Sequence, residues 1–333
     1  MSNYSISIVI PAFNAQKTIA QAIDAARNQD YQRSIEIIVV DDGSTDATAQ
    51  IATSFAGVKY IHQKNLGPAV ARNRGFKESR GDIIFFTDSD CVAQNDWVSR
   101  CVAHFSDDKI GVVCGTYGIV NTRNLLAQCV HAEIVFRHRV LLPDFPKAFG
   151  SYNFCVRRSV FEGVGGFNKH YRFASGEDND LSYRILQMGY KIYFERKAVV
   201  AHHHPERVMK YLSEQYRHGF WRAKMYFDHP QMSIGDDYTF WKDIVEPPLA
   251  LLITLLFFIN TAFFWANLVY LYLFLAGLSA LILIELFYGF MTTKSFFKGA
   301  FWTLIMLLRA FVRMAGFSLG FPLFFAKKTF QKN

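Results

Sequence analysis

The sequence is poor in features that mark several classes of protein. Its 333 residues include only five cysteines, and no two of them form a C-x-x-C pair. No internal repeat or low-complexity segment occurs, which argues against a solenoid and against a disordered tail. The cysteines stand in apolar surroundings, so we expect reduced core thiols without chemistry of their own at Cys91, Cys101, Cys114, Cys129 and Cys155.

Long basic stretches are also lacking, although the chain is basic overall. Its formal net charge is +8 and its isoelectric point is near 9.1, yet lysine and arginine are dispersed along the chain. No segment interleaves aromatic with basic residues, a pattern typical of nucleic-acid binding. The positive charge therefore favours phosphorylated ligands or an anionic membrane surface as partners, and it argues against nucleic acid.

Two further patterns are missing near the start of the chain. No basic segment followed by an apolar stretch precedes the alternation of Ile6, Ile8 and Ile10, so no signal peptide is indicated and we expect the first region to stay in the cytosol. No G-x-G-x-x-G follows that segment either. This absence argues against a dinucleotide oxidoreductase, although such enzymes are also α/β proteins.

Five short apolar segments alternate with segments of helical character. Continuous runs such as IEIIVV are typical of strands covered by helices on both faces. We therefore predict a doubly wound, mostly parallel α/β sheet with flanking helices up to about residue 120, which binds ligands beyond the carboxyl ends of its strands. The segments are Ile6 to Ile10, Ile35 to Val40, Val58 to Ile61, Ile83 to Thr87 and Val112 to Thr116.

The next hundred residues have a mixed pattern that we interpret as the acceptor half of the same domain. We expect a helix near Leu125 to Val140, a glycine-rich bend at GVGGF, a helix from about Asp178 to Met188, and short strands around Ile192 and Val199.

Apolar runs dominate the last part of the chain. The 36 residues from Leu249 to Ile284 carry no charge. As one helix they would be roughly 54 Å long, too long for one crossing of a hydrocarbon core of about 30 Å. We predict a cytosolic domain over 1–240 and a membrane-associated helical region over 241–333, with spans at about 249–266 and 268–290 and an outer turn at 265–267.

The final apolar stretch, at about 299–325, carries two arginines one helical turn apart, Arg309 and Arg313. Arginine in the middle of a bilayer is unfavourable. A third crossing would also place Lys327, Lys328 and Lys332 outside, against the positive-inside tendency. We therefore expect an amphipathic helix in the membrane interface.

Two acids follow the apolar segment GDIIFF directly. Alternate residues at a strand end project to the same side, so Asp88 and Asp90 are expected to converge while Ser89 faces away. Two convergent carboxylates suit Mg²⁺ or Mn²⁺ shared with the phosphates of a substrate. A plain turn explains the tripeptide equally well, and taken alone it is the stronger explanation.

A second acidic cluster, Asp41 to Asp46, follows IEIIVV. Carboxylates at a strand end can accept hydrogen bonds from a base or a ribose, and Gly43 permits close approach of the backbone. An ordinary helix start explains Ser44 to Asp46, but it does not require two adjacent acids, Asp41 and Asp42, at the strand end.

Two more segments carry charge at the start of a helix. Asn65 to Gly75 has a proline in the first turn and offers Arg72 and Arg74 to phosphates, although a solvated helix face explains the arginines as well. Gly176 to Asp180 is a dense acidic turn. The helix dipole favours acids there, and a carboxylate in this turn could also be the general base of an inverting sugar transfer.

Three consecutive histidines, His202 to His204, follow a short strand. Neutral imidazole is a good metal ligand. Three adjacent residues cannot all face one ion, so at most one or two of them are ligands.

Taken together, six motifs resemble the family 2 glycosyltransferases with the GT-A fold, in order and in spacing. The resemblance covers roughly Ser5 to Met225. The motifs are IVIPAFN, VVDDGSTDAT, NLGPAVARNRG, DSD, NFCVRRSVFEGVGGFN and GEDNDLSYRILQMGYKI.

The resemblance implies a role for individual residues. It implies that Asp178 is the catalytic base with Glu177 as its neighbour, and that a divalent cation, Mg²⁺ or Mn²⁺, is held by Asp88, Asp90 and His202. The pocket for the nucleotide-diphosphate sugar is then expected from Pro11, Ala12, Asn14, Asp41, Asp42, Gly67, Arg72, Asn73, Asp88 and Ser89.

One segment departs from the pattern of processive members, which carry Q-x-x-R-W after the base. Here Gln215 to Trp221 reads QYRHGFW. The chain is therefore more similar to members that add single sugars to lipid-linked intermediates of surface glycans. We expect a metal-dependent, inverting, hexosyltransferase-type enzyme at the cytosolic face of the inner membrane, acting on a membrane-held and lipid-linked acceptor.

Two alternatives remain beside this hypothesis. One is a processive polysaccharide synthase, and the other is a catalytically silent, nucleotide-sugar-binding membrane subunit of a larger assembly. The expected partners are a nucleotide sugar, the glycan acceptor, membrane lipids and other glycan-assembly proteins. The sequence names neither the sugar nor the acceptor, because specificity depends on the shape of the pocket.

Overall fold

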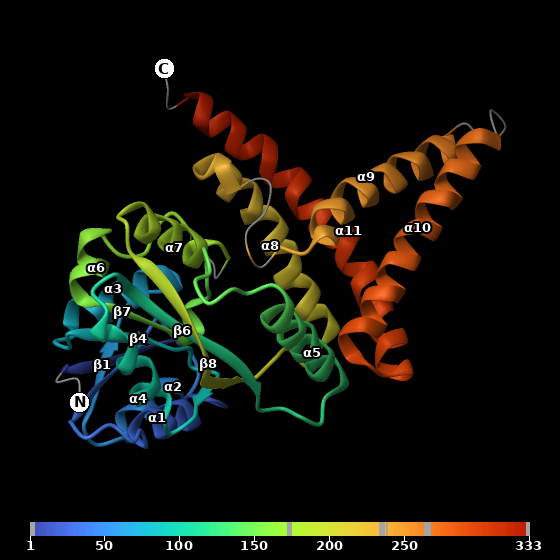
Figure 1. The fold of residues 1–333 in the computed structure, drawn as a ribbon. Helices are drawn as coiled ribbons and strands as arrows, with labels where there is room; N and C mark the ends of the chain where they lie inside the picture. The colour runs from blue at the N-terminus through green and yellow to red at the C-terminus, as the bar shows by residue number, and fades with distance from the viewer. Residues whose placement is uncertain (1–3, 172–174, 233–236, 238, 263–267, 331–333) are drawn as a thin grey trace. The chain divides into compact units, whose positions relative to one another are not determined.

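The computed structural model describes residues 4–171, 175–232, 237, 239–262 and 268–330. The chain divides into two compact units (Figure 1). The sheet unit comprises Met1–Asn121 and Leu142–His204, and the helical unit comprises Thr122–Leu141 and Pro205–Asn333. The assignment of residues 1–240 to the cytosol stays a prediction.

The sheet unit is built on one eight-stranded sheet with the order β3-β2-β1-β4-β7-β6-β8-β5. All five strands expected from the sequence are present, whereas β5 and β7 were not expected and β8 is one strand in place of two. The strands are β1 (Ile6–Ala12), β2 (Ile35–Asp41), β3 (Val58–His62), β4 (Ile83–Phe86), β5 (Cys91–Ala93), β6 (Ile110–Ile119), β7 (Phe154–Arg157) and β8 (Lys191–His202).

The sheet is more mixed than the expected, mostly parallel one. Strands β3, β2, β1 and β4 pair in parallel, and β6 pairs in parallel with β8. β7 lies antiparallel between β4 and β6, and β5 lies antiparallel beside β8. Both unexpected strands are only three or four residues long. The sequence of a short apolar strand does not indicate whether the strand pairs in parallel or antiparallel. The pairing direction depends on where the chain re-enters the sheet.

Helices lie on both faces of this sheet, as expected for a doubly wound unit (Figure 1). They are α1 (Ile19–Arg27), α2 (Thr48–Thr53), α3 (Pro68–Glu78), α4 (Trp97–Val102), α6 (Arg158–Gly163) and α7 (Glu177–Gln187), with short 3₁₀ turns η1 (Ala103–Ser106) and η2 (Ser151–Asn153). The central strands β1 and β4 are fully buried, and all five cysteines are buried free thiols as expected.

The local sequence determines where α3 begins and how closely it packs on the sheet. Gly67 precedes the helix with a φ of 94°, a conformation that glycine adopts without strain, and Pro68 supplies the first helical residue. A Cβ on Gly75 would lie 2.2 Å from Val9 Cγ1 on β1. Because only glycine fits there, α3 packs closely on the sheet.

The helical unit contains α5 (Leu125–Val140), α8 (Val208–Asp228), η3 (Pro230–Met232), α9 (Trp241–Ala262), α10 (Leu268–Thr293) and α11 (Phe296–Phe330). Three helices of the described chain are long and apolar enough to cross a membrane, over residues 241–262, 268–293 and 296–326. The two predicted spans fall largely on α9 and α10. The predicted turn at 265–267 lies outside the described residues.

The two arginines of α11 have different surroundings. Arg309 is 1% exposed and donates to Glu133 of α5, with 2.7 Å between Nη1 and Oε2. Arg313 donates to Gln215 Oε1 of α8 at 2.8 Å. The unfavourable exposure of arginine to lipid therefore does not apply to Arg309, which faces protein. The in-plane position of α11 stays a prediction.

Candidate active site

The carboxyl ends of β1, β2 and β3 meet at one edge of the sheet, where Ala12, Asp41 and His62 stand side by side in register. Asp41 is 1% exposed and accepts from the Ser44 N–H at 2.8 Å and from the Tyr60 hydroxyl at 2.7 Å. Burial alone raises the pKa of Asp41, but these hydrogen bonds bring it below its ordinary value. Asp41 is therefore an ionised, well-anchored acceptor.

Asp42, the second acid of this pair, holds the backbone ahead of α3. One of its oxygens accepts from the Leu66 N–H at 2.9 Å and from Gln63 Nε2 at 2.7 Å. The other accepts from the Gly67 N–H at 2.8 Å. Both carboxylate oxygens of Asp42 therefore hold the backbone at the start of α3. The donor-binding role expected for Asp42 and Gly67 stays a prediction.

Asn14 ties the loop after β1 to the loop after β2. Its φ is 49°, in the left-handed region that asparagine tolerates. Its N–H donates to Ser44 Oγ at 2.9 Å, and its Oδ1 accepts from the Thr45 N–H at 2.8 Å. Pro11 and Ala12 are buried in β1. These residues shape the edge of the sheet beside Asp41.

Arg72 of α3 joins two acids that are distant in sequence. Its Nη2 donates to Asp88 Oδ1 at 2.7 Å, and its Nη1 donates to Glu177 Oε1 at 3.2 Å. The side chain is 3% exposed. Burial lowers the pKa of Arg72, but the charges of Asp88, Asp178 and Glu177 raise it overall. The structure therefore brings Arg72, Asp88 and Glu177 together.

Asn73, the next residue, binds a backbone segment that the sequence analysis did not connect with the site. Its Oδ1 accepts from the Phe167 N–H and its Nδ2 donates to the Phe167 carbonyl, both at 2.8 Å. Gly166 has a φ of 73°, and a Cβ there would lie 2.6 Å from Asn73 Oδ1. The glycine-rich bend GVGGF was the only signal for this contact.

The DSD tripeptide forms a turn between β4 and β5. The Cys91 N–H donates to the Asp88 carbonyl at 3.1 Å, and Ser89 lies partly exposed within the turn. The alternation of side chains along a strand therefore does not apply to these residues. Asp88 is directed to Arg72, whereas Asp90 Oδ1 lies 3.3 Å from His202 Nε2.

Asp90, Cys91 and His202 form the group best suited to hold a metal ion within the described part of the chain, with possible ligand atoms that all lie within 4.8 Å of one another. Pairing of β5 with β8 places Cys91 opposite His202. Burial raises the pKa of the Cys91 thiol well above its usual value, so this thiol is protonated when no metal ion is bound. The Asp90 carboxylate and the His202 imidazole fit a divalent cation such as Mn²⁺.

The three histidines face different neighbours, as expected for adjacent residues. The Nδ1 atoms of His202 and His204 lie 3.3 Å apart, and His203 Nε2 lies 3.1 Å from Gln21 Oε1. His202 is the histidine beside Asp90. His203 points to a different part of the sheet unit and is not placed to share a ligand with His202.

The two acids that open α7 differ in exposure, since Glu177 is buried whereas Asp178 is partly exposed. Glu177 Oε2 accepts from the Ser175 N–H at 2.7 Å, while Asp178 Oδ1 is buried without a hydrogen-bond partner among the described residues. Burial and the charge of Asp178 raise the pKa of Glu177 to about 8. Burial also raises the pKa of Asp178, opposed by the charge of Arg72. Asp178 thus combines a free acceptor atom with an elevated pKa.

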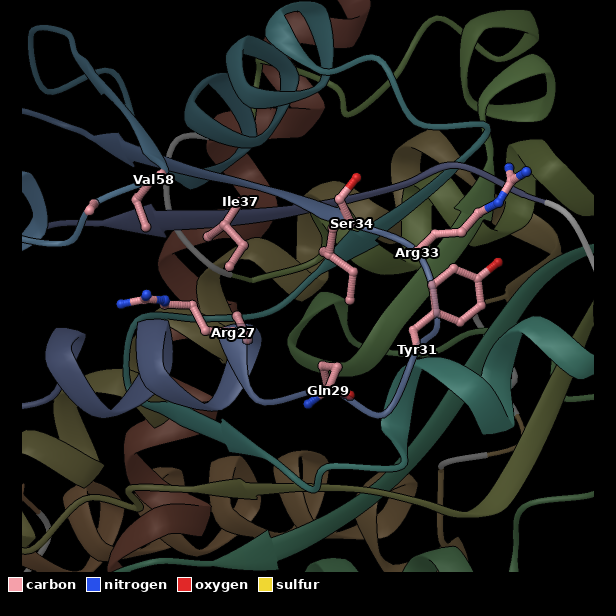
Figure 2. A pocket seen from close by; sticks show the side chains of 11 residues that line it. Arg27, Gln29, Tyr31, Arg33, Ser34, Ile37 and Val58 are labelled. Atoms are coloured by element: carbon pink, nitrogen blue, oxygen red, sulfur yellow. The ribbon is translucent and has the colours of Figure 1, made fainter.

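A separate hollow lies at the opposite ends of the strands (Figure 2). Ser34, Ile35 and Val58, at the amino ends of β2 and β3, line it together with Arg27 and Tyr31. None of the acids expected to bind the donor lines this hollow, so we do not assign the site there.

Comparison with known proteins identifies the family of the domain that carries this site. Residues 7–165 match the family model described as glycosyl transferase family 2. The chain carries a family 2 glycosyltransferase domain. This domain contains all the expected donor-binding residues and Asp90, while Glu177, Asp178 and His202 follow it in the sheet unit.

Curated relatives of this glycosyltransferase domain include bacterial and archaeal proteins. The chain is 31% identical to the probable glycosyltransferase YdaM of Bacillus subtilis, over 60% of this chain and 51% of that protein. It is 30% identical to the O-antigen chain rhamnosyltransferase RfbN of Salmonella typhimurium, over 60% of this chain and 66% of that protein. The chain spans about half the length of the first relatives that it matches.

A solved structure is similar in fold over most of the chain. The mannosyltransferase PcManGT from Pyrobaculum calidifontis, determined with GDP-Man and Mn²⁺, superimposes with a TM-score of 0.60 and 19% identity. The match covers 95% of this chain and 87% of that one. This likeness confirms the GT-A fold class expected from the sequence, followed by apolar C-terminal helices.

Proposed function

We propose that this glycosyltransferase moves a sugar from a nucleotide-diphosphate sugar to a membrane-held, lipid-linked acceptor, with inversion at the anomeric carbon. The observation that carries the proposal is Asp178, whose free carboxylate oxygen is buried beside Arg72, Asp88 and Glu177. A carboxyl with an elevated pKa is a stronger base than an ordinary one once it is ionised. Membership of family 2 supports the reaction class.

The donor site is proposed at the carboxyl edge of the sheet, from Asp41 and Asn14 to the DSD turn. Asp41 is an ionised acceptor suited to a hydroxyl or base N–H of the nucleotide. Asp90 and His202 would hold the divalent cation, with Asp88 on the adjacent turn. Such a cation, when bound, stabilises the negative charge of a departing diphosphate. A solved neighbour in complex with GDP-Man and Mn²⁺ supports a nucleotide sugar as the donor and a divalent cation as the cofactor.

The transfer is proposed as one displacement. Asp178 takes the proton of an acceptor hydroxyl, and the hydroxyl oxygen forms a bond to the anomeric carbon. The bond from that carbon to the diphosphate oxygen breaks, and the nucleoside diphosphate leaves with the electron pair. A single displacement inverts the anomeric centre. Because burial raises the pKa of Asp178, the rate should fall on acidification at a higher pH than an ordinary aspartate would give.

A membrane-held acceptor is supported by the helical unit. Three of its described helices are apolar and long enough to span a bilayer. The relatives include an O-antigen chain rhamnosyltransferase, which supports a surface glycan as the product. We place the sheet unit on the cytosolic side of the inner membrane, where nucleotide sugars are available.

The test compares Asp178→Asn with Asp180→Asn, an equal change of charge in the same helical turn. Asp180 pairs with Arg184, whose Nη2 lies 2.7 Å from Asp180 Oδ2. Purified protein in native lipid extract is screened against a panel of nucleotide sugars, with products identified by mass spectrometry. We expect Asp178→Asn to lower turnover by at least about 100-fold while nucleotide binding survives.

Asp180→Asn should retain turnover per folded molecule. If Asp178→Asn transfers sugar as fast as the unmodified protein, Asp178 is not the base. If no nucleotide sugar in the panel yields a product, the subunit without catalysis becomes the better explanation.

A further inference from the structure

Arg72 connects three segments of the sheet unit that are distant in sequence. From α3 it donates to Asp88 in the turn after β4, and to Glu177 at the start of α7. Asp88 lies beside the proposed cation site, and Glu177 directly precedes the proposed base. One side chain therefore joins the donor half of the site to the residue next to the base.

The guanidinium group is also supported on its face. Its central carbon lies 5.4 Å from the ring centre of Phe167. The backbone of Phe167 is held on both sides by Asn73, through two hydrogen bonds of 2.8 Å. The residue next to Arg72 thus fixes the ring beneath it, which restricts the orientations open to the guanidinium.

The backbone that carries Arg72 is equally constrained. Asp42 accepts the N–H groups of Leu66 and Gly67 just before α3 begins. Gly75 lies so close to Val9 that no side chain would fit between them. The backbone that carries Arg72 is therefore held at both ends of this segment, and the side chain of Arg72 is closely confined, with 3% of it exposed.

We propose that Arg72 is a positioning residue, which holds Asp88 and the start of α7 in one arrangement, and that it is not a ligand of the donor phosphates. This inference rests on the proposed function and changes the role that the sequence suggested for Arg72. Both ends of the guanidinium already donate, one to the Asp88 carboxylate and the other to the carboxyl group of Glu177. A shift of the held groups by about 1 Å would lower turnover by on the order of 100-fold.

The first test needs no knowledge of the donor. Hydrogen exchange is measured on peptides covering residues 88–93 and 175–187 in Arg72→Met, Arg72→Lys and Arg74→Met. Arg74 is the matched control, because it lies on the same helix with its side chain 50% exposed. We expect at least roughly tenfold faster exchange of both peptides in Arg72→Met, a smaller change in Arg72→Lys and no change in Arg74→Met. Unchanged exchange in Arg72→Met overturns the proposal.

The second test separates positioning from phosphate binding. Affinity for UDP and for GDP, each with Mn²⁺, is measured by calorimetry, and turnover is measured with the donor found in the screen. A positioning role predicts that Arg72→Met loses roughly 100-fold in kcat and keeps its affinity for the bound nucleoside diphosphate within about threefold. Added guanidinium should restore part of the turnover of Arg72→Ala.

Asn73→Ala extends this test to the support of Phe167. We expect it to lower kcat in the same direction as Arg72→Met but by less, since Asn73 holds only the ring beneath the guanidinium. A loss of nucleoside diphosphate affinity of about tenfold or more in Arg72→Met, with kcat retained at saturating donor, would identify a phosphate ligand and overturn the proposal. Activity in Asp178→Asn would remove the proposed base and leave the exchange result on Arg72 unaffected.

Discussion

Arg309 of α11 donates to Glu133 of α5 within the helical unit, with 2.7 Å between Nη1 and Oε2 and both residues buried. Close by, the ammonium group of Lys242 is shared by Glu246 at 2.8 Å and Glu285 at 3.0 Å. These contacts join α11 to α5 and α9 to α10, and Arg309 Nε lies 3.8 Å from Glu246 Oε1 between α11 and α9. Burial raises the pKa of Glu133, but the charges of Arg309 and Arg137 lower it to about 2, so Glu133 is ionised.

Removing one partner of this pair should be strongly destabilising. Glu133→Gln leaves Arg309 with Glu246 at 3.8 Å, and Arg309→Met leaves Glu133 with Arg137 at 2.8 Å, so each change should cost up to about 3–5 kcal/mol. The double variant should lose less than the sum of the single losses, because the two residues share one interaction. Thermal unfolding of detergent-solubilised protein measures these differences. As a control, Asp144→Asn removes an exposed partner of Arg196 and should change stability by about 1 kcal/mol or less. Strictly additive losses would show that the pair is not coupled.

Close packing of α8 on α11 should make Gly219 intolerant of any side chain. A Cβ on Gly219 would lie 2.2 Å from the carbonyl oxygen of Arg313, a backbone atom that cannot turn aside. We expect Gly219→Ala to destabilise the protein by roughly 1–3 kcal/mol. Gly277→Ala in α10 is the control, since a Cβ there meets only flexible side chains, Ile253 at 3.3 Å and Leu249 at 3.9 Å. Alanine favours a helix by up to about 1 kcal/mol over glycine, so Gly277→Ala should be neutral or stabilising.

The stability of the sheet unit should fall as the pH rises through the pKa of Glu177. Its folded pKa of about 8 exceeds the ordinary value of 4.5, so folding favours the protonated form and the benefit is lost between about pH 4.5 and pH 8. Glu177→Gln mimics the protonated form and does not titrate. Relative to the unmodified protein, its melting temperature should therefore improve from about pH 5 to about pH 8. An offset that stays constant with pH would mean that Glu177 keeps an ordinary pKa.

The dependence of sugar transfer on a metal ion should change when Asp90 or His202 is substituted. Chelation with EDTA should abolish transfer, and Mn²⁺ should restore it. Asp90→Asn and His202→Ala should raise the Mn²⁺ concentration for half-maximal rate by at least about tenfold. His203→Ala is the matched control, because His203 faces Gln21 and should leave that concentration unchanged. Equal effects of His202→Ala and His203→Ala would contradict a ligand role for His202.

Much of the sheet unit could be predicted from short-range pattern. The runs IEIIVV and GDIIFF became β2 and β4, and the polar residues that follow them lie at the ends of those strands. The acids of GEDND stand at the start of α7, where the helix dipole favours them. Such features depend on residues within a few positions of one another, so a single sequence records them.

Other features depend on partners far along the chain. The sequence pattern predicted that Asp88 and Asp90 converge. In the structure a turn directs Asp88 to Arg72 and Asp90 to His202. Asp42, which was expected to bind the donor, accepts hydrogen bonds with both carboxylate oxygens from backbone N–H groups just before α3. The spacing of the residues predicts neither of these contacts, because each contact depends on loops that meet only after the sheet has formed.

The sequence by itself determined the family, the strand ends that carry the acids, and the apolar helices at the C-terminal end, because periodicity and local motifs specify these without reference to distant residues. Only the tertiary structure decided which charges meet. It pairs Arg309 with Glu133 across 176 positions and Arg72 with Glu177 across 105. A buried charge or hydrogen-bonding group has lost its contacts with water, so it must find a partner wherever the fold brings one.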